Sequence, residues 1–328
     1  MANATVSRLG LVDNTGTNFN ELFLKVFSGE VLTAFARNNI FNEQLHSVRT
    51  ITSGKSAQFP VTGTATAAYH TPGTPLVGAN QIRHGERIVS IDDLLISQAF
   101  VSNLDELKNH YDVRATYADE LGKALAKTYD QNVAKVIANA SRASSTLTGI
   151  AGGLTLTLGS GNTASANVSG DEIAAAIYDI AQTFDERDIP PTDRFCVLPP
   201  AEYYKLAESA TRTVDVDFNP GGNGSFASGR VQMIAGIPVM MSNNIPQSNV
   251  SSNPSGANNT YSGDDSKTIG LVFHKSAVGT VKLMDMTTEI SGQDYGIMYQ
   301  GTLLVAKYAL GHGILRPECA ATIKLSAS

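Results

Sequence analysis

Apolar positions repeat with a helical period in two stretches of the chain. Residues 19–38 carry Phe or Val at every fourth position from 23 to 35, which predicts a helix with one apolar face. Residues 102–139 keep apolar side chains at three- and four-residue steps and predict a second helix, about 55 Å long at about 1.5 Å per residue. Helices this long are unusual in compact enzyme domains. The second helix therefore favours an elongated scaffold.

Between these helices, residues 51–91 change to short alternations of apolar and polar positions. The alternation is clearest at the two ends, SAQFPVTG and ERIVSID, and Gly and Pro separate them. This pattern predicts a long, hairpin-like extension. Its middle has almost no large apolar residues, so the extension cannot bury a core of its own. We expect it to lie on the surface of another molecule.

The rest of the chain mixes short strand and helix patterns. Strands are predicted at LTLTL within residues 147–167, at 194–198 and at 237–242, and helices at 171–184, after a capped start at Ser169, and at 201–208. Residues 211–229 and 245–267 read as loops. The second loop is so rich in Ser, Asn and Gly that it is predicted to be exposed. Alternation in GTVKLMDMTTEIS and MYQGTLLVAKYAL, within residues 269–324, predicts long paired strands.

Composition favours a subunit that is packed in an assembly. Charged residues make up 16% of the chain, against roughly 25% in ordinary soluble domains, and small polar residues take their place. The formal charge is -6 and no cluster of Lys or Arg occurs, so sequence-specific binding of nucleic acid is not expected. A neutral or acidic inner face would suit a container to which packed nucleic acid must not stick.

Other features predict neither a secreted nor a metal-binding protein. Cys196 and Cys319 have no CxxC spacing, so folding in a reducing cytoplasm is the simplest inference. The first residues lack the apolar core of a signal peptide, and no apolar run is long enough to span a membrane. The six histidines show no metal-ligating spacing. We expect no catalytic, cofactor-binding or metal site and no membrane partner.

Three short motifs imitate ligand sites without meeting their requirements. Gly54-Lys55-Ser56 resembles the end of a P-loop, but the first glycine of that motif falls on Arg49. Residues 159–164 match a dinucleotide fingerprint, yet residues 165–170 separate them from the next predicted helix. Residues 215–226 begin like a calcium loop but place Pro at its sixth position and Phe at its twelfth. Each motif is predicted to be an ordinary turn or loop.

Five longer blocks are more specific than these motifs. They are ELFLKVFSGEVLTAFARNNIF (21–41), VRTITSGKSAQFPVTGTATAAYHTPGTPL (48–76), NHYDVRATYADELGKALA (109–126), IGLVFHKSAVGTVKLMDM (269–286) and AKYALGHGILRPECAA (306–321). In this order, and along nearly the whole chain, they resemble the major capsid protein of short-tailed double-stranded DNA phages of the autographivirus, or podovirus, type. The shell subunits of those phages share the Hong Kong phage capsid fold.

The resemblance implies an α+β fold of that type and a structural role. Its parts would be an N-terminal arm and helix (1–50), an extended loop (51–91), a peripheral domain with a spine helix (92–140), an axial domain (141–268), and return strands with the last axial-domain strand (269–328). Such a protein would self-assemble as hexamers and pentamers into an icosahedral head around double-stranded DNA. It would not be an enzyme.

The resemblance also implies partners and contact residues. Partners would be further copies of the chain, a scaffolding protein, a portal protein and DNA held without sequence specificity. The resemblance also allows a decoration protein as a further partner. The chain would assemble in the host cytoplasm and end in the virion. Lys55, Gln58, Phe59, Arg83 and Arg87 would lie near subunit boundaries. Some proteins of this fold crosslink Lys to Asn, but the short-tailed family is not expected to, so Lys55 is interpreted as an ordinary polar residue.

Three alternatives stay open at this point. An encapsulin-type shell protein shares the fold but would hold protein cargo in place of DNA. A cytoplasmic α/β enzyme using the loop at 159–164 would be stabilised thermally by its cofactor. A phage tail or adhesin module would form fibres.

Overall fold

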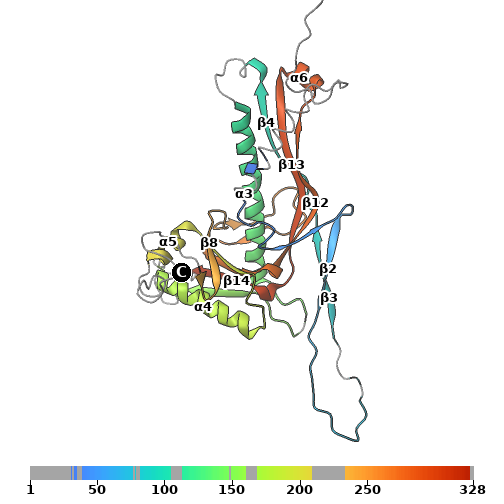
Figure 1. Cartoon of the computed structure of the whole chain (residues 1–328), viewed down its shortest axis with the longest axis vertical. Helices are drawn as coiled ribbons and strands as arrows, with labels where there is room; N and C mark the ends of the chain where they lie inside the picture. The colour runs from blue at the N-terminus through green and yellow to red at the C-terminus, as the bar shows by residue number, and fades with distance from the viewer. Residues whose placement is uncertain are drawn as a thin grey trace, which may run out of the picture. The chain divides into compact units, whose positions relative to one another are not determined.

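The computed structural model describes residues 31, 33–34, 39–76, 78, 82–104, 113–147, 149–159, 168–208 and 233–325. These residues belong to two compact units (Figure 1). The first unit comprises Met1–Asn39, Asp93–Tyr129 and Met284–Leu310, and the second comprises Ile40–Asp92, Asp130–Leu283 and Gly311–Ser328. Helix α3 (Val113–Arg142) and strands β12 (Val278–Ile290) and β13 (Gly301–Ile314) contribute residues to both units.

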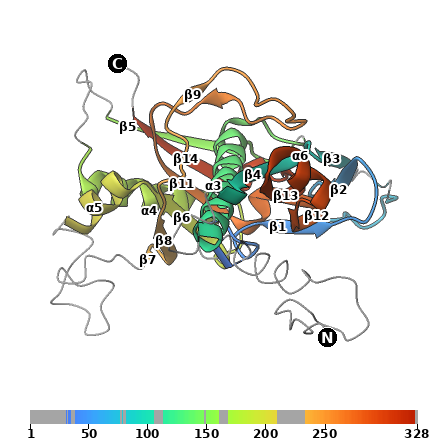
Figure 2. The same ribbon diagram turned by 90° about the horizontal axis from the view of Figure 1, so that it is seen from above.

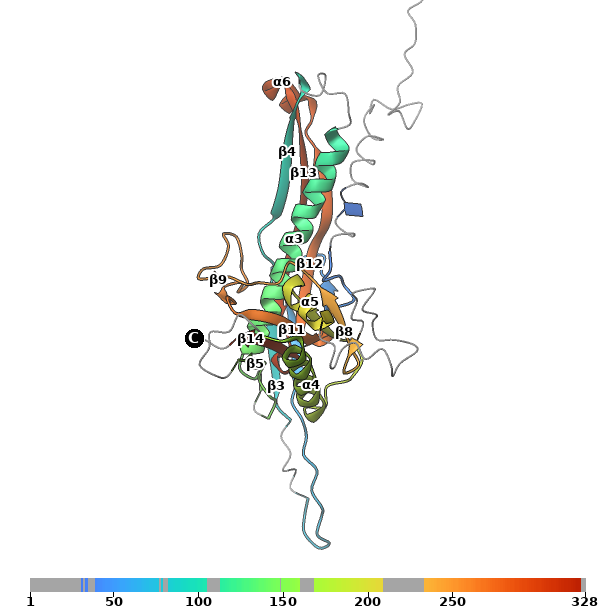
Figure 3. The ribbon, with the colours of Figure 1, turned by 90° about the vertical axis from the view of Figure 1, so that its left-hand side faces the viewer.

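Long strands and the first half of α3 build the first unit (Figure 3). Strand β4 (Leu95–Ser102) pairs antiparallel with β13, from Gly301 opposite Ser102 to Tyr308 opposite Leu95. The Tyr129 ring of α3 meets the Tyr308 ring edge to face at 6.4 Å. Helix α6 (Gln293–Tyr299) joins β12 to β13 and ends at Gln300, whose φ of 54° is left-handed.

A six-stranded sheet forms the core of the second unit, with the order β5-β14-β11-β6-β8-β7. Its strands are β5 (Leu154–Leu158), β6 (Arg194–Leu198), β7 (Met233–Ile234), β8 (Ile237–Met241), β11 (Thr268–His274) and β14 (Ala320–Leu325). Strand β11 is antiparallel to both of its neighbours, β14 and β6. Its Phe273 ring lies 6.0 Å from the Phe195 ring and 6.0 Å from the Phe41 ring.

The buried residues of helix α4 (Gly170–Glu186) recur at helical spacing, so one face of the helix packs on apolar side chains of this unit. Ile173, Ile177, Ile180 and Phe184 are all buried. The helix has the capped start predicted at Ser169. The structure shows it as a capping box, in which the Ser169 hydroxyl accepts a hydrogen bond from the Glu172 amide and the Glu172 side chain accepts from the Ser169 amide. Helix α5 (Pro200–Glu208) packs beside α4 (Figure 2).

Smaller elements complete the second unit. Strand β1 (Ser47–Thr50) pairs in parallel with the start of β12, from Ser47 opposite Gly279 to Thr50 opposite Lys282. Two one-turn 3₁₀ helices, Lys275–Ala277 and Pro317–Cys319, follow β11 and precede β14. Two-residue strands β9 (Asn249–Val250) and β10 (Gly263–Asp264) pair antiparallel. Among the described residues, no helix is both long and apolar enough to cross a membrane.

Most of the predicted elements are present where residues are described. The strands predicted at 154–158 and 194–198 match β5 and β6, and the predicted helices at 171–184 and 201–208 match α4 and α5 within two residues. The prediction that MYQ opens a strand is wrong, because Met298 and Tyr299 close α6 and β13 starts at Gly301. Most of the helix predicted at 19–38, and the loops at 160–167 and 211–229, lie outside the described residues.

Candidate self-assembly surface

The predicted extension is a two-stranded hairpin with two different faces. Strands β2 (Ser56–Thr62) and β3 (His84–Ser90) pair antiparallel, from Ser56 opposite Ser90 to Thr62 opposite His84. Side chains of paired residues point to the same face of such a ladder. Ala57 and Val89 therefore share one face and are buried, whereas Gln58 and Ile88 share the other and are exposed.

The inner face of the hairpin is held by its own subunit. The Arg49 guanidinium lies over the Phe59 ring, 5.8 Å from its centroid, and its Nη1 donates to the Gln58 carbonyl at 2.9 Å. Arg87, opposite Phe59 in the ladder, donates through Nε and Nη2 to the Thr146 hydroxyl at 3.2 and 2.9 Å. Phe59 and Arg87 thus have partners within the subunit that contains them.

The outer face and the tip present apolar side chains to solvent. Ile88 is 60% exposed, and the Gln58 amide beside it donates to the Glu86 carboxylate. Beyond the strands, Tyr69 and Leu76 are 106% and 86% exposed. These three side chains present apolar surface that a neighbouring molecule could cover.

Lys55 immediately precedes β2, and Arg83 immediately precedes β3. Both side chains are exposed. The Lys55 carbonyl accepts from the Ile91 amide at 2.9 Å, and the Arg83 carbonyl accepts from the Gly63 amide at 2.8 Å. Gly54, with a φ of 114°, makes a bend that leads into a strand, and no helix N-terminus follows it as a P-loop requires.

The second unit also contains a buried carboxylate, Asp130, that no sequence pattern indicates. Asp130 of α3 accepts hydrogen bonds from the Ile40 amide at 3.0 Å, the Phe41 amide at 3.1 Å and the Asn244 side chain at 3.1 Å. Burial raises the pKa of Asp130 to about 6, although these three hydrogen bonds act in the opposite direction. The carboxylate fixes the backbone where it enters this unit.

Two buried histidines are held neutral. Burial lowers the pKa of His46 to about 4. Burial, with a smaller repulsion from His46, lowers the pKa of His312 to about 3. The Nδ1 atom of His312 lies 2.8 Å from the Thr280 hydroxyl. Both residues are buried packing residues.

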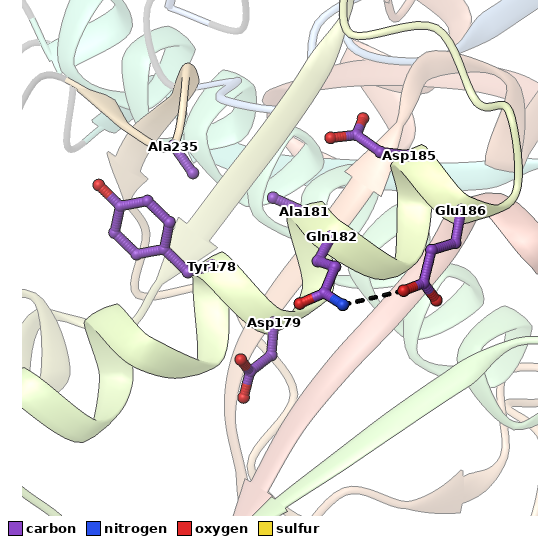
Figure 4. A pocket seen from close by; sticks show the side chains of 7 residues that line it. All are labelled: Tyr178, Asp179, Ala181, Gln182, Asp185, Glu186 and Ala235. Carbon is purple, nitrogen blue, oxygen red and sulfur yellow. Dashed lines mark hydrogen bonds between the residues drawn. The ribbon is translucent and has the colours of Figure 1, made fainter.

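One open pocket of about 620 Å³ lies along α4 (Figure 4). Tyr178, Asp179, Gln182 and Glu186 line it from the helix, and Ala235 comes from the turn between β7 and β8. Gln182 donates to Glu186 at 2.9 Å. The pocket holds no nucleophile paired with a base, and the described residues contain no cluster of His, Cys, Asp and Glu that could hold a metal.

The fold defines the class of the protein through solved structures of viral shells. The capsid structure of the cyanophage P-SCSP1u matches with a TM-score of 0.80 and 47% identity, covering 100% of both chains. The mature capsid of bacteriophage PhiM1 matches with a TM-score of 0.71 over 89% of this chain and 88% of that chain; at 20% identity, this likeness concerns the fold alone. The chain is a phage shell subunit with the Hong Kong phage capsid fold.

Sequence comparison places the chain within a family. The family model described as Gp10A-like major capsid protein matches residues 58–324. The major capsid protein of Escherichia phage T7 is 34% identical over 320 residues, which cover 92% of this chain and 91% of that protein. The chain belongs to the Gp10A-like major capsid protein family.

This membership confirms the predicted fold class, the structural role and the family resemblance. The chain is a capsid protein and not an enzyme, it assembles with copies of itself, and it is a component of the virion. The capsid interpretation is therefore preferred over the enzyme and the tail module.

Proposed function

We propose that the chain forms hexamers and pentamers that close into an icosahedral head around double-stranded DNA. Assembly would take place in the host cytoplasm with a scaffolding protein, a portal at one vertex and room for a decoration protein. The net charge of -6 and the lack of a Lys/Arg cluster support a wall that encloses DNA without gripping it. The subunit would use the division expected above: arm and helix (1–50), extended loop (51–91), peripheral domain (92–140 with the return strands of 269–328) and axial domain (141–268 with the last strand of 269–328).

The observation that carries this proposal is the extended hairpin. It forms a full ladder, yet its outer face and tip leave Ile88, Tyr69 and Leu76 largely exposed. A two-stranded hairpin is marginal in water unless its face packs on something else. We therefore assign the outer face and the tip, with Lys55, Gln58 and Arg83, to the contact with a neighbouring subunit.

Phe59 and Arg87 take a different role in this proposal. Their contacts with Arg49 and Thr146 lie within the chain, so they would hold the hairpin at the angle from which it reaches the neighbour. Their loss would affect assembly indirectly, through the direction of the hairpin.

Replacing residues 63–83 by Asn-Gly tests the proposal. This pair closes a two-residue hairpin turn, and Thr62 and His84 are already paired, so the shortened ladder should form. We expect the variant to fold, with wild-type circular dichroism and thermal unfolding, and to form no closed shells when it is expressed with the scaffold. Sedimentation and negative-stain microscopy measure the shells.

A second variant serves as the control. Keeping all residues of the tip but changing Tyr69 and Leu76 to Ser preserves its reach and removes its apolar contacts. Shell yield between that of the wild type and that of the shortened variant is expected. Closed shells of normal size and yield from the shortened variant would refute a role for the tip in assembly.

A further inference from the structure

The Ser- and Asn-rich segment at residues 249–264, which we term the bridging loop, is bonded on two sides. The sequence predicts only an exposed loop here, and many of its side chains are exposed. Its polar groups nevertheless contact two other elements of the second unit, the end of β3 and the C-terminal part of α3. The contacts lie entirely within that unit.

On one side, the loop holds the backbone at the root of the hairpin. The Asn259 side chain accepts from the Ser90 amide at 3.2 Å and donates to the Ser90 carbonyl at 2.6 Å, as a neighbouring strand would. The Asn258 side chain donates to the Ile91 carbonyl at 2.7 Å. Asp92 Oδ1 accepts from the amides of Asn258 at 2.7 Å and Asn259 at 3.1 Å.

Tyr261 closes this side of the contact. Its hydroxyl donates to Asp92 Oδ2 and accepts from the His312 amide at 3.2 Å, and the side chain is 3% exposed. Strand β13 comes so close that a Cβ at Gly311 would lie 1.9 Å from the Ser90 carbonyl oxygen. The hairpin root is therefore fixed from the loop and from β13.

On the other side, three residues on one face of α3 hold the loop backbone. Asn139 donates to the carbonyls of Thr260 and Ser262, both at 3.1 Å. Lys135 donates to the Gly263 carbonyl at 3.1 Å, and Arg142 donates to the Asp264 carbonyl at 2.7 Å. Positions 135, 139 and 142 follow one another at helical spacing, so one stripe of the helix makes all of these bonds.

Ion pairs and close packing next to these bonds restrict movement of the loop relative to α3. Asp265 is buried and pairs with Lys135 at 2.6 Å and with Arg142 at 2.6 Å. Gly263 has a φ of 155°, and a Cβ there would lie 2.7 Å from Arg142 Nη2. Breaking one partner of a buried ion pair leaves the other charge uncompensated, which strongly opposes local opening.

We propose that the bridging loop is a strut that fixes the direction of the extended hairpin relative to the C-terminal part of α3. The loop links the root of the hairpin to α3, because each of them makes hydrogen bonds to this one short segment. The consequence for assembly rests on the proposed function of the hairpin, because a hairpin that must reach a neighbouring subunit needs a defined angle at its root. The strut itself is a property of the single, unassembled chain.

Hydrogen exchange of the unassembled full-length chain tests the strut from both of its ends. N259A removes the two side-chain hydrogen bonds to Ser90 at the hairpin root, and the amides of Ser90 and Ile91 should exchange about tenfold faster. N139A removes two of the four hydrogen bonds at α3, those to the Thr260 and Ser262 carbonyls on either side of Tyr261, and the same two amides should also exchange faster, although Asn139 does not touch them. N249A is the matched control, because Asn249 lies in the same loop with an exposed side chain, and wild-type exchange is expected.

Exchange of the β11 amides shows whether the fold is intact. If an alanine variant loosens β11, N139L or N259L replaces it, since each keeps nearly the size of the side chain and loses its hydrogen bonds without adding a charge. Unchanged exchange at Ser90 and Ile91 in the Asn139 variant would overturn the strut, whatever the Asn259 variant does. Because no shell is needed for the measurement, this outcome is separate from failure of the hairpin to mediate assembly.

Discussion

Strands β11 and β2 are both seven residues long, and they use their side chains in opposite ways. In β11, six of the seven residues are buried, and both edges are paired with other strands of the sheet. In β2, only Ala57 is buried, and one edge is paired. Backbone hydrogen bonds form in both strands, so the difference lies in apolar burial. The sheet is stabilised by apolar burial within the subunit, whereas the hairpin leaves apolar side chains exposed to solvent.

The largest effect should come from the centre of the sheet. F273A removes a ring that contacts the rings of Phe41 and Phe195, and we expect it to lower the free energy of unfolding by about 3–5 kcal/mol. Denaturant unfolding of the unassembled chain measures this loss. The control is Y69A at the exposed tip, where a change within about 0.5 kcal/mol is expected. Equal losses in the two variants would abolish the contrast between sheet and hairpin.

Acid should weaken the buried core of the second unit more than the exposed hairpin of the same unit. His46 and His312 have folded pKa values of about 4 and 3, below their ordinary 6.5, so their stabilisation is present above pH 6.5 and is lost as the pH falls. At pH 5 the loss is about 2 kcal/mol for each histidine. Asp130 acts in the opposite direction. Because its folded pKa is raised to about 6, protonation at pH 5 stabilises the folded state and offsets about 1 kcal/mol of the loss from the histidines.

The free energy of unfolding, measured at pH 7 and at pH 5, tests the expected net loss of stability. H312Q should reduce the loss between the two pH values, whereas D130N should increase it by removing the offset. A chain that is more stable at pH 5 than at pH 7 would contradict the expected sign of this pH dependence.

A smaller effect is expected at the start of α4. S169A removes the acceptor of the Glu172 amide and one half of the capping box, at a cost of about 1 kcal/mol in unfolding free energy. S255A, in the exposed part of the bridging loop, should cost nothing measurable. Thermal unfolding of the two variants side by side shows whether local helix signals matter to this unit.

The smallest effect on the isolated chain should come from the outer face of the hairpin. I88S changes a side chain that is 60% exposed, so the free energy of unfolding should move by less than about 0.5 kcal/mol. Shell yield in the presence of scaffold should nevertheless fall, because a polar side chain would replace an apolar contact with the neighbour. Normal shell yield would show that this face stays in solvent after assembly.

The sequence predicted elements well where one local rule decides them. The LTLTL strand, the buried strand at 194–198 and the capped helix start at Ser169 all follow from short patterns. The contacts of the extension could not be predicted in this way. Its five candidate residues came from a family resemblance, and only the tertiary structure shows that Phe59 and Arg87 have partners within the chain while Gln58 lies on the exposed face.

The bridging loop shows the same limit more sharply. Its Ser, Asn and Gly content correctly predicts exposure, but composition does not reveal that Asn259 contacts Ser90, 169 positions away. Such pairs of side chain and backbone depend on which distant elements the fold brings together. Asp130 is a similar case, since a single Asp within a helical pattern does not indicate the two backbone amides from which it accepts hydrogen bonds.

The position of β14 in the six-stranded sheet has a consequence for synthesis. This strand, at residues 320–325, lies between β5 and β11 and joins them in the sheet. The ribosome must therefore deliver residues 320–325 before β5, at residues 154–158 and so far earlier in the chain, can join the rest of the sheet. A chain interrupted by premature termination would lack an interior strand. Incomplete translation products would then be left to proteases instead of entering a growing shell.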